Sequence, residues 1–280
     1  MMLLNPGQLF SGVVLVVAPH MDDEVLACGG SLAGLPDKNK VYVVYATDGK
    51  RSPVRTAGAP SPDLVAIREG EAREALSVLG IPEPNIRFLG LPDGHLRQYV
   101  DRLAQALAGL IHSIQPDQIL VPFRYDRHPD HLALNRATAQ AAAQWGSAAK
   151  MYEYFVYYRY RLLPGGDIRN FILPDLTINI DTRAWSELKR EALLRYRSQT
   201  TLFYHWQSRP ILPPKRIEEV SQQQEIFLAS DPGFPGASVF GKAKTWIRLV
   251  HLIEPQVKNG KERLLDLLKA GRTSNDGQVR

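Results

Sequence analysis

An apolar run, Val13 to Val17, leads directly into the polar sequence His20-Met21-Asp22-Asp23-Glu24. A run of this kind is typical of a buried strand in a parallel sheet. In open α/β sheets, ligands gather at the carboxyl ends of such strands, where the chain turns into a helix. A histidine and two carboxylates at that turn suit a metal site, with His20 and Asp23 as ligands and Asp22 left as a base. Capping of the following helix would explain one aspartate, but not an adjacent pair.

A second polar cluster occurs far along the chain, in the sequence Asp126-Arg127-His128-Pro129-Asp130-His131. It also follows an apolar run, at residues 119–123, and precedes a stretch with helical character at residues 132–144. Because the carboxyl ends of parallel strands meet at one edge of a sheet, both clusters are expected at the same edge. Two histidine–carboxylate clusters in equivalent positions are hard to explain by packing and indicate a functional site.

Strand and helix patterns alternate through the first half of the chain, as in a doubly wound α/β fold. We therefore predict a three-layer α/β/α architecture, Rossmann-like, with a mostly parallel sheet and a less regular C-terminal part. The expected strands are 13–18, 41–46, 86–91, 119–123, 152–158 and 176–180, and the expected helices are 23–35, 63–79, 99–113, 132–144 and 183–196. Beyond residue 200 the pattern weakens, and a helix near 216–228 and a strand near 245–253 are predicted.

The length of 280 residues suits one sizeable domain with a small appendage. We predict a Rossmann-like core over residues 1–200, an extension packed on it over residues 201–280, and a disordered tail from about residue 271. The single cysteine, Cys28, excludes an internal disulfide and fits a reducing cytoplasm, where we expect the protein to be located. No apolar run reaches the roughly 20 residues of a membrane span, and no signal peptide is expected.

Charge and motif content argue against several other classes of function. The net charge is +5, and part of it lies in the basic stretch 183–216, which is either a solvated helix face or a surface that attracts an anionic substrate or a membrane. No zinc finger, RNP motif or repeated basic–aromatic pattern points to nucleic acid. The turn after the first strand lacks the Gly-x-Gly-x-x-Gly of dinucleotide binding, and the chain has no Walker A loop, nucleophile elbow or H-E-x-x-H helix.

The pairing of Pro19-His20-Met21-Asp22-Asp23-Glu24 with His128-Pro129-Asp130-His131 resembles the PIG-L/LmbE-like family of metal-dependent sugar N-deacetylases. That family includes the N-acetylglucosaminyl-phosphatidylinositol deacetylases and the deacetylases of mycothiol and bacillithiol synthesis. The resemblance covers roughly the first two-thirds of the chain. Met21 departs from it, because the family usually has proline there, and we expect a local backbone change without loss of chemistry. The last third matches only loosely, and substrate choice could be encoded in it.

The resemblance implies a divalent metal held by His20, Asp23 and His131, with zinc as the first choice and iron or another divalent ion as the alternative. Such an ion polarises an amide carbonyl and lowers the pKa of water, and Asp22 is then the base that accepts the proton of the attacking water. His128, as an imidazolium, could stabilise the tetrahedral oxyanion.

Three further residues complete the predicted site. Asp130 is expected to hold a histidine tautomer from outside the ligand shell, to cap the following helix, or both. Arg68 and Asp93 match positions at which relatives in the family bind sugar hydroxyls, for which guanidinium and carboxylate groups are suitable. The alternative for Arg68 is a surface pair with Glu71 or Glu74.

These observations predict a cytoplasmic, zinc-dependent hydrolase that removes an N-acetyl group from an N-acetylglucosamine-type sugar, giving a free amine and acetate. Another metal-dependent amidase or an esterase is the alternative among enzymes. A catalytically silent sugar-binding module is the alternative outside them, although a pure binder has no need of a base such as Asp22 beside a metal. The predicted partner is a small sugar or glycoconjugate, and a homo-oligomer is left open.

Overall fold

The structure, a computed structural model, describes residues 3–53, 63–144, 146–230, 239–247, 249–251 and 253. Its strands are β1 (Leu3–Leu4), β2 (Val14–Ala18), β3 (Val41–Thr47), β4 (Ile86–Leu91), β5 (Gln118–Pro122), β6 (Lys150–Tyr154), β7 (Thr177–Ile180) and β8 (Glu225–Ser230). Its α-helices are α1 (Pro6–Leu9), α2 (Asp23–Gly34), α3 (Leu64–Val78), α4 (Val100–Ile114), α5 (Pro129–Gln144), α6 (Ser186–Arg195), α7 (Arg197–Thr200) and α8 (Pro214–Gln222). Short 3-10 helices are η1 (Lys38–Lys40), η2 (Glu83–Asn85), η3 (Leu96–Tyr99), η4 (Ile168–Phe171), η5 (Pro174–Leu176), η6 (Arg183–Trp185) and η7 (Gly241–Ala243).

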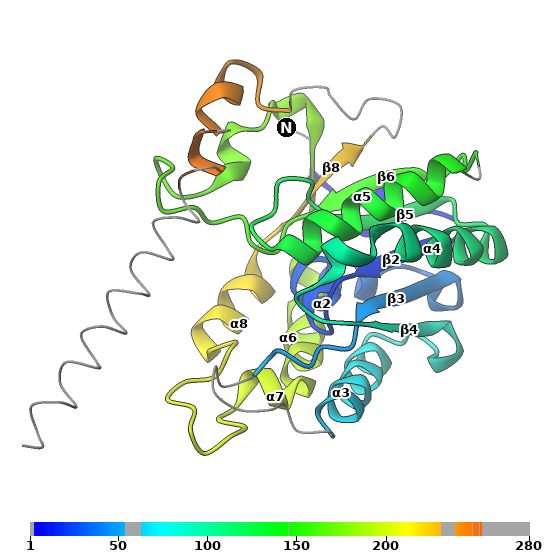
Figure 1. The fold of residues 1–280 in the computed structure, drawn as a ribbon, viewed down its shortest axis with the longest axis vertical. Helices are drawn as coiled ribbons and strands as arrows, with labels where there is room; N and C mark the ends of the chain where they lie inside the picture. The colour runs from blue at the N-terminus through cyan, green and yellow to red at the C-terminus, as the bar shows by residue number, and fades with distance from the viewer. Residues whose placement is uncertain are drawn as a thin grey trace, which may run out of the picture. The chain divides into compact units, whose positions relative to one another are not determined.

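One sheet of eight strands, in the order β1-β7-β8-β6-β5-β2-β3-β4, organises the described residues (Figure 1). The strands β2 to β6 pair in parallel, as do β1 and β7, whereas β8 is antiparallel to both of its neighbours. Helices α2, α3 and α6 cover one face of the sheet, and α4 and α5 cover the other. The predicted three-layer α/β/α fold with a mostly parallel sheet is therefore confirmed.

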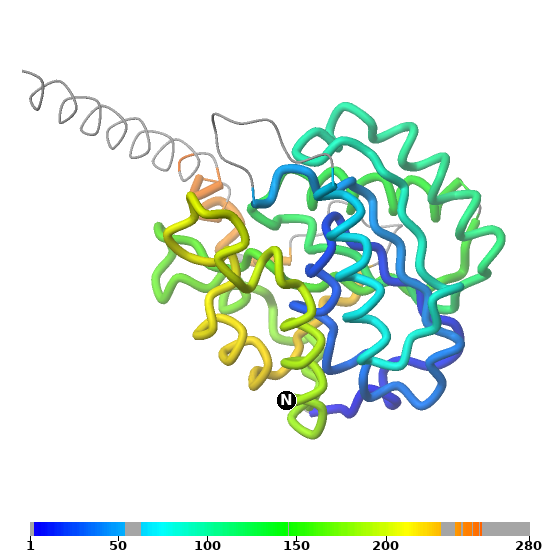
Figure 2. The backbone as a smooth tube through the Cα atoms, turned by 90° about the horizontal axis from the view of Figure 1, so that it is seen from below, coloured from blue at the N-terminus to red at the C-terminus, as the bar shows by residue number. Residues whose placement is uncertain are grey.

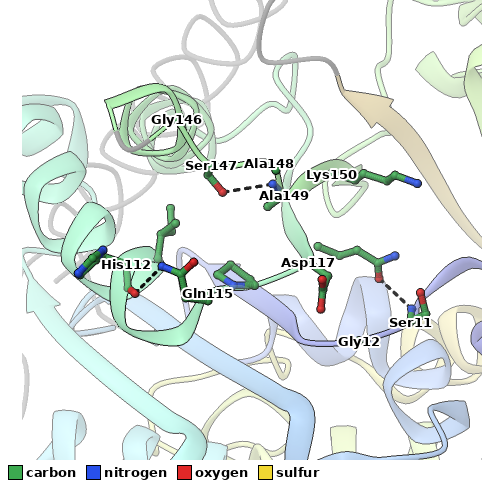
Figure 3. Close-up of a pocket in the computed structure, with 13 residues that line it drawn as sticks. Ser11, Gly12, His112, Gln115, Asp117, Gly146, Ser147, Ala148, Ala149 and Lys150 are labelled. Atoms are coloured by element: carbon green, nitrogen blue, oxygen red, sulfur yellow. Dashed lines mark hydrogen bonds between the residues drawn. The ribbon is translucent and has the colours of Figure 1, made fainter.

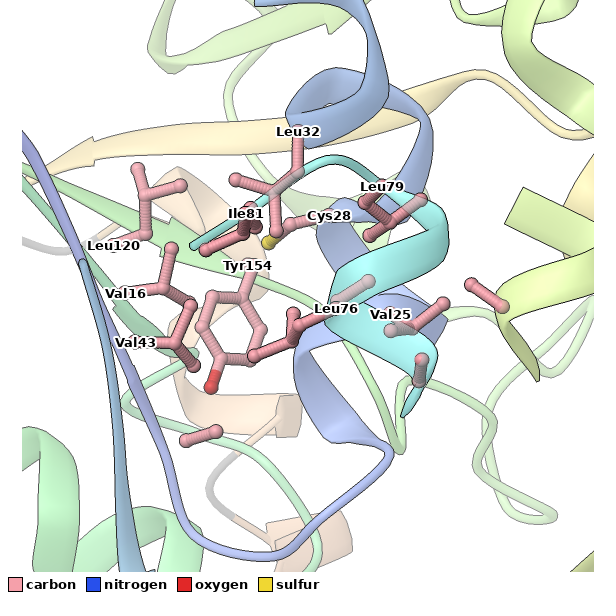
Figure 4. Close-up of a cluster of buried hydrophobic side chains, with 14 of the residues drawn as sticks. Val16, Val25, Cys28, Leu32, Val43, Leu76, Leu79, Ile81, Leu120 and Tyr154 are labelled. Carbon is pink, nitrogen blue, oxygen red and sulfur yellow. The ribbon is translucent and has the colours of Figure 1, made fainter. Parts of the chain in front are cut away.

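Alternate residues of the central strand β2 serve two separate cores. Val14 and Val16 face the core under α2, α3 and α6, in which the thiol of Cys28 is also buried (Figure 4). Leu15 and Val17 face the opposite core, which packs against α4 and α5. Since successive side chains of a strand point to opposite faces, both faces of β2 are covered and the whole strand is buried, as the continuous apolar run predicts.

Contacts divide the chain into two units, Met1–Tyr157 with Asp175–Pro235 and Tyr158–Pro174 with Gly236–Arg280. The whole sheet belongs to the first unit, in which α3 and α6, distant in sequence, lie side by side (Figure 2). The predicted domain boundary at residue 200 falls inside this unit, because α8 and β8 continue it. The tail predicted from residue 271 lies outside the described residues. None of the helices in the described ranges is long and apolar enough to cross a membrane.

The C-terminal part differs most from the sequence expectation. Helix α8 ends at Gln222 and the chain then enters β8, so the predicted helix 216–228 is wrong in its second half. The described residues between 244 and 253 are helical, where the sequence predicts a strand. Strand β8 pairs with β6 on one side and β7 on the other, and these backbone partners outweigh its local propensity.

A buried carboxylate fixes β8 to α2. Glu225, the first residue of β8, accepts the N–H groups of Gly30 and Ser31 in the middle of α2, each at 2.8 Å. Lys189 of α6 donates to the same carboxylate at 2.7 Å, and both charged side chains are buried. A Cβ atom on Gly30 would lie 2.5 Å from Thr182, so only glycine permits the close approach of the chain at this point. One ion pair therefore joins α2, α6 and the sheet.

Removing this carboxylate should destabilise the protein strongly. Glu225→Ala leaves the Lys189 ammonium buried without a counter-ion, which we expect to lower the free energy of unfolding by about 3–5 kcal/mol. Urea denaturation followed by circular dichroism measures the change. Glu218→Ala is the matched control, because Glu218 is an exposed glutamate of α8 and its loss should change stability by less than about 0.5 kcal/mol. An equal effect in both variants would contradict the structural role of the buried pair.

Candidate active site

The predicted site residues come from the carboxyl ends of neighbouring strands. His20 lies two residues after β2, Asp93 lies two residues after β4, and the cluster 126–131 follows β5. The sheet order β5-β2-β3-β4 makes these strand ends adjacent. The N–H of Thr47, at the end of β3, donates to the Pro19 carbonyl at 3.1 Å and holds the ends of β2 and β3 together. The structure therefore brings both polar clusters to one edge of the sheet.

Asp23 lies between the two histidines that are predicted as its co-ligands. Its Oδ2 atom is 3.0 Å from His20 Nδ1 and 3.2 Å from His131 Nε2. In a tetrahedral zinc site with bonds of about 2.0–2.1 Å, neighbouring ligand atoms are roughly 3.3 Å apart. Both spacings are close to that value, and all three side chains are buried.

Each of these histidines turns its second ring nitrogen toward another carboxylate. His20 Nε2 lies 3.2 Å from both Asp93 Oδ1 and Asp130 Oδ2. His131 Nδ1 lies 3.3 Å from Asp126 Oδ2. A carboxylate at the outer nitrogen is typical of metal-ligating histidines, because it fixes the tautomer and the orientation of the ring.

Asp130 is held by the loop that follows β4. Its Oδ2 accepts the N–H of Gly94 at 2.7 Å and its Oδ1 accepts the N–H of Leu96 at 3.0 Å. Its own N–H donates to Nδ1 of His128 at 3.3 Å. Both carboxylate oxygens of Asp130 thus accept hydrogen bonds from this loop, and Oδ2 also contacts the His20 ring. The geometry matches the expected contact with a histidine more closely than a helix cap.

The buried charges of the cluster shift one another's pKa values. Burial by itself would raise the pKa of Asp23, but the positive charges of His131 and His20, together with the hydrogen bond of His20, hold it well below its ordinary value. Burial by itself would lower the pKa of His131, but Asp126 and Asp23 raise it to about 9. The carboxylates therefore require positive charge at this place, which either protonated histidines or a divalent cation can supply.

The side chains present fit a divalent metal. Both ring nitrogens of His131 are buried, and within the described ranges neither makes a hydrogen bond of acceptable geometry. Buried polar atoms normally have a partner, and a cation would satisfy the nitrogen that faces the other ligands. Donor atoms of His20, His128 and His131 lie within 4.8 Å of one another, as do those of His20, Asp93 and Asp130. The described residues thus contain nitrogen and oxygen donors suited to zinc or iron.

Asp22 faces the pocket beside the ligand set. Its φ angle is 123°, a conformation that residues with side chains rarely adopt and that functional sites maintain against strain. Its carboxylate lies 3.8 Å from the guanidinium of Arg68. Burial raises the pKa of Asp22 to about 8, while the charge of Arg68 opposes this shift and the charges of Asp23 and Glu24 add to it. A carboxylate with a raised pKa in a pocket wall has the properties of a general base.

Glu24 holds the backbone of Asp22. Its carboxylate accepts the N–H of Asp22 at 3.1 Å and also accepts a hydrogen bond from the hydroxyl of Tyr196. The Tyr196 hydroxyl lies 3.5 Å from that of Tyr45, and all three side chains are buried. Burial raises the pKa of Glu24 to about 7, against the hydrogen bonds of the two tyrosines. The sequence gives no sign of this network, because Tyr196 is 172 residues from Glu24 along the chain.

His128 lies beside the other two histidines, with its ring centre 4.8 Å from that of His20 and 5.1 Å from that of His131. Burial, together with the positive charges of His20 and His131, lowers the pKa of His128 to about 4. These influences favour the uncharged ring over the predicted imidazolium, and a metal ion held by the neighbouring histidines would act in the same direction. The ring of Tyr157 stacks on His128 with ring centres 5.9 Å apart.

A pocket of about 480 Å³ opens onto these residues, within the size range of small-molecule sites. Of the predicted residues, its wall contains His20, Asp22, Arg68, Asp93 and His128. The pocket is also lined by Leu26, Arg51, Ser52, Gly94, Val156, Tyr157, Gln199, Ile211, Leu212 and Arg216.

Arg68 belongs to the buried part of this wall. It is 1% exposed and donates to the carbonyls of Met21 and Gly49, so the departure at Met21 leaves a backbone contact of the site in place. Its Nε is also buried and has no hydrogen-bond partner among the residues that the structure describes. Glu71 instead accepts hydrogen bonds from Ser198, and the surface pair considered for Arg68 is not formed.

Some wall residues could have been found from the sequence and others could not. Tyr157 follows β6, so the strand-end rule that locates His20 and His128 also points to it. Ile211 and Arg216 lie before and within α8, in a part of the chain without a regular pattern. No local signal places them at the site.

A second pocket, of about 610 Å³, lies at the amino-terminal ends of β2, β5 and β6 (Figure 3). Loops around Gly12, Gln115 and Ser147 line it. Its one carboxylate, Asp117, already accepts the N–H of Val13 at 2.7 Å. Among the residues with assigned positions, no group of metal-binding side chains gathers there, so the smaller pocket is the candidate active site.

Known deacetylases are similar to this chain in sequence. The family described as PIG-L, GlcNAc-PI de-N-acetylase, matches residues 15–142. The "Probable N-acetyl-alpha-D-glucosaminyl L-malate deacetylase 2" of Bacillus cereus is 34% identical over 137 residues, which cover 47% of this chain and 61% of that protein. This chain thus matches less than two thirds of that relative's length. A "1D-myo-inositol 2-acetamido-2-deoxy-alpha-D-glucopyranoside deacetylase" of Rhodococcus jostii is 28% identical over 243 residues, covering 68% of this chain and 82% of that protein.

Solved structures agree with this match at the level of the fold. The N,N'-diacetylchitobiose deacetylase from Pyrococcus horikoshii superimposes with a TM-score of 0.64 at 21% identity, covering 85% of this chain and 90% of that chain. The family match over residues 15–142 contains both polar clusters, together with Arg68 and Asp93. The predicted resemblance to the PIG-L/LmbE-like family of deacetylases is therefore confirmed over residues 15–142.

Proposed function

We propose that this protein is a metal-dependent hydrolase that removes the N-acetyl group from an N-acetylglucosamine-type sugar or glycoconjugate, giving a free amine and acetate. The observation that carries the proposal is the position of Asp23 between His20 and His131, with Asp22 facing the pocket beside them. The names of the B. cereus and R. jostii relatives, both deacetylases of glucosaminyl compounds, support it. Zinc is the proposed metal, with iron as the alternative, and a cytoplasmic location stays a prediction.

In the proposed reaction, three residues bind the metal and a fourth transfers protons. His20, Asp23 and His131 would hold the metal, which when bound polarises the acetyl carbonyl and lowers the pKa of a water molecule. Asp22 accepts the proton of the attacking water and can return it to the nitrogen of the departing amine. A single carboxylate with a raised pKa is suited to both transfers, because it binds and releases a proton near neutral pH.

Other residues orient the substrate and the ligand set. His128 donates a hydrogen bond to the oxyanion of the tetrahedral intermediate. Arg68 and Asp93 bind sugar hydroxyls in the pocket wall. Asp130 and Asp126 hold the outer nitrogens of the two ligand histidines and so keep their inner nitrogens directed at the metal.

A metal analysis tests the ligand set. The protein should contain one divalent metal ion per chain, and His20→Ala and His131→Ala should each lose most of it, because each removes one of three ligands. His112→Ala is the matched control, because His112 lines the other pocket, and it should keep full occupancy. Elemental analysis of the purified proteins gives the result. Full occupancy in both ligand variants would exclude the proposed set.

The Asp22→Asn variant tests whether Asp22 is the base and not a metal ligand. The variant should keep the metal and lose about 100- to 10,000-fold in kcat, because an amide cannot accept the proton of water. The assay is acetate release from a panel of N-acetylglucosaminides. Asp117→Asn, a change of the carboxylate in the other pocket, should leave kcat unaltered. Near-normal turnover of Asp22→Asn would show that another group is the base.

The activity should rise with pH through the titration of Asp22. Asp22 must be deprotonated, and its acid limb should lie below the pKa of about 8 of the metal-free site, because a bound cation favours the carboxylate. His128 is uncharged in this range, because burial and the neighbouring positive charges lower its pKa to about 4, and its neutral ring donates an N–H to the oxyanion. His128→Ala should lower turnover by about 100- to 1000-fold without moving the acid limb, while the metal remains bound. Loss of the metal in this variant would instead make His128 a ligand.

A further inference from the structure

The pocket contains a second group of residues that the proposed chemistry does not use. We call Arg51, Ile211, Leu212 and Arg216 the outer wall of the pocket. Gln199 connects the segment that carries Arg51 with the segment of residues 211–216. The N–H of Leu212 donates to the Gln199 carbonyl at 2.8 Å, and the Gln199 side chain exchanges hydrogen bonds with Ser52 at 2.8 and 2.9 Å. The outer wall is therefore a fixed surface of the pocket.

The carboxylates of the pocket do not compensate the charge of this wall. Asp22 and Asp93 are the two carboxylates among the lining residues. Asp22 lies near Arg68, and Asp93 contacts His20. The exposed guanidinium of Arg51 contacts His95 at 3.1 Å, and no carboxylate in the described ranges lies within 4.0 Å of it. Arg51 thus brings to the pocket a positive charge that no carboxylate of the described residues compensates.

The second arginine of the outer wall is partly neutralised. Arg216 lies 3.4 Å from Glu219 on the same helix. Beside it, Ile211 is 48% exposed and offers an apolar surface. The outer wall therefore combines one full cation, one weaker cation and aliphatic surface.

The backbone places Arg51 next to the proposed sugar site. Its N–H donates to Asp93 Oδ2 at 2.8 Å, and Asp93 is the carboxylate proposed to bind sugar hydroxyls. A Cβ atom on Gly94, which has a φ of 77°, would lie 2.9 Å from Arg51 Cδ, so the arginine stem packs closely over this glycine. A group attached to a sugar bound at Asp93 would come within reach of the guanidinium.

We propose that the outer wall is a subsite for an anionic group, a carboxylate or a phosphate, on the molecule to which the sugar is attached. Arg51 recognises the anion, Arg216 adds a smaller attraction, and Ile211 covers the carbon atoms between the anion and the sugar. The proposal rests on the proposed deacetylase function and adds the class of substrate to it, an anionic glucosaminide.

Matched pairs of glycosides test the proposal. One pair is the 1-O-carboxymethyl glycoside of N-acetylglucosamine and its uncharged carboxamide. The other is the 1-O-(2-phosphoethyl) glycoside and its 1-O-(2-hydroxyethyl) counterpart, so that the two pairs distinguish a carboxylate from a phosphate. We expect kcat/KM to be about tenfold higher for the anionic member of at least one pair at low ionic strength. The preference should shrink as salt is added.

Variants assign the preference to the outer wall. Arg51→Gln should bring the ratio of kcat/KM values close to one, and Arg216→Gln should reduce it less. Arg87→Gln is the matched control, because Arg87 is an exposed arginine near the start of β4, at the opposite end of that strand from the site, and it should keep the full preference. A preference that survives Arg51→Gln, or equal kcat/KM values within both pairs, would overturn the proposal.

A binding measurement keeps this test independent of turnover. Calorimetric titration of Asp22→Asn with the same four glycosides gives their Kd values without hydrolysis. Absence of acetate release from every glycoside by the unmodified enzyme would refute the proposed function. Tighter binding of an anionic glycoside that is lost in Asp22→Asn/Arg51→Gln would still support the subsite. Equal Kd values within both pairs would refute it.

Discussion

Asp23 carries a negative charge that is almost completely removed from water, and the arrangement of the site follows from the way this charge is balanced. A buried carboxylate is stable only when it is paired or bound to a metal. Two histidines flank it, and each of them is held in turn by a carboxylate at its outer nitrogen. Because the buried acids outnumber the buried bases, the cluster favours a cation at its centre. The strained backbone of Asp22 persists beside it because Glu24 and the surrounding packing hold it in place.

The location of the site could be predicted because it depends on local sequence and on one rule of topology. An apolar strand that ends in His20 and Asp23, and another that ends in His128 and His131, must meet if both strands lie in one parallel sheet. The contacts that hold these residues could not be predicted in the same way. The amides of the loop after β4 that hold Asp130 are defined only once the strands are in place.

The part of the chain beyond residue 200 shows why propensity failed there. The sequence of β8, Glu225-Ile226-Phe227-Leu228-Ala229-Ser230, contains good helix formers and follows three glutamines, so it reads locally as the continuation of α8. Its pairing with two strands distant in sequence makes it a strand instead. The same region supplies Ile211 and Arg216 to the pocket, so two of the residues proposed to distinguish substrates lie where local patterns describe the chain least well.

The hydrogen bond from Tyr196 to Glu24 has a consequence for how such enzymes can be recombined. The family match ends at residue 142, yet the carboxylate that supports the backbone of Asp22 takes its donor from beyond that point. Residues 15–142 therefore do not contain every contact that holds Asp22 in place, and they cannot be transferred alone to another protein with that contact intact. A chimera that joined them to a foreign C-terminal part would need an equivalent hydroxyl at the same place, whereas residues 211–216 could be exchanged without touching that contact. Within the segment beyond residue 142, the residues proposed to select the substrate can thus be exchanged while the Tyr196 contact that supports Asp22 is kept.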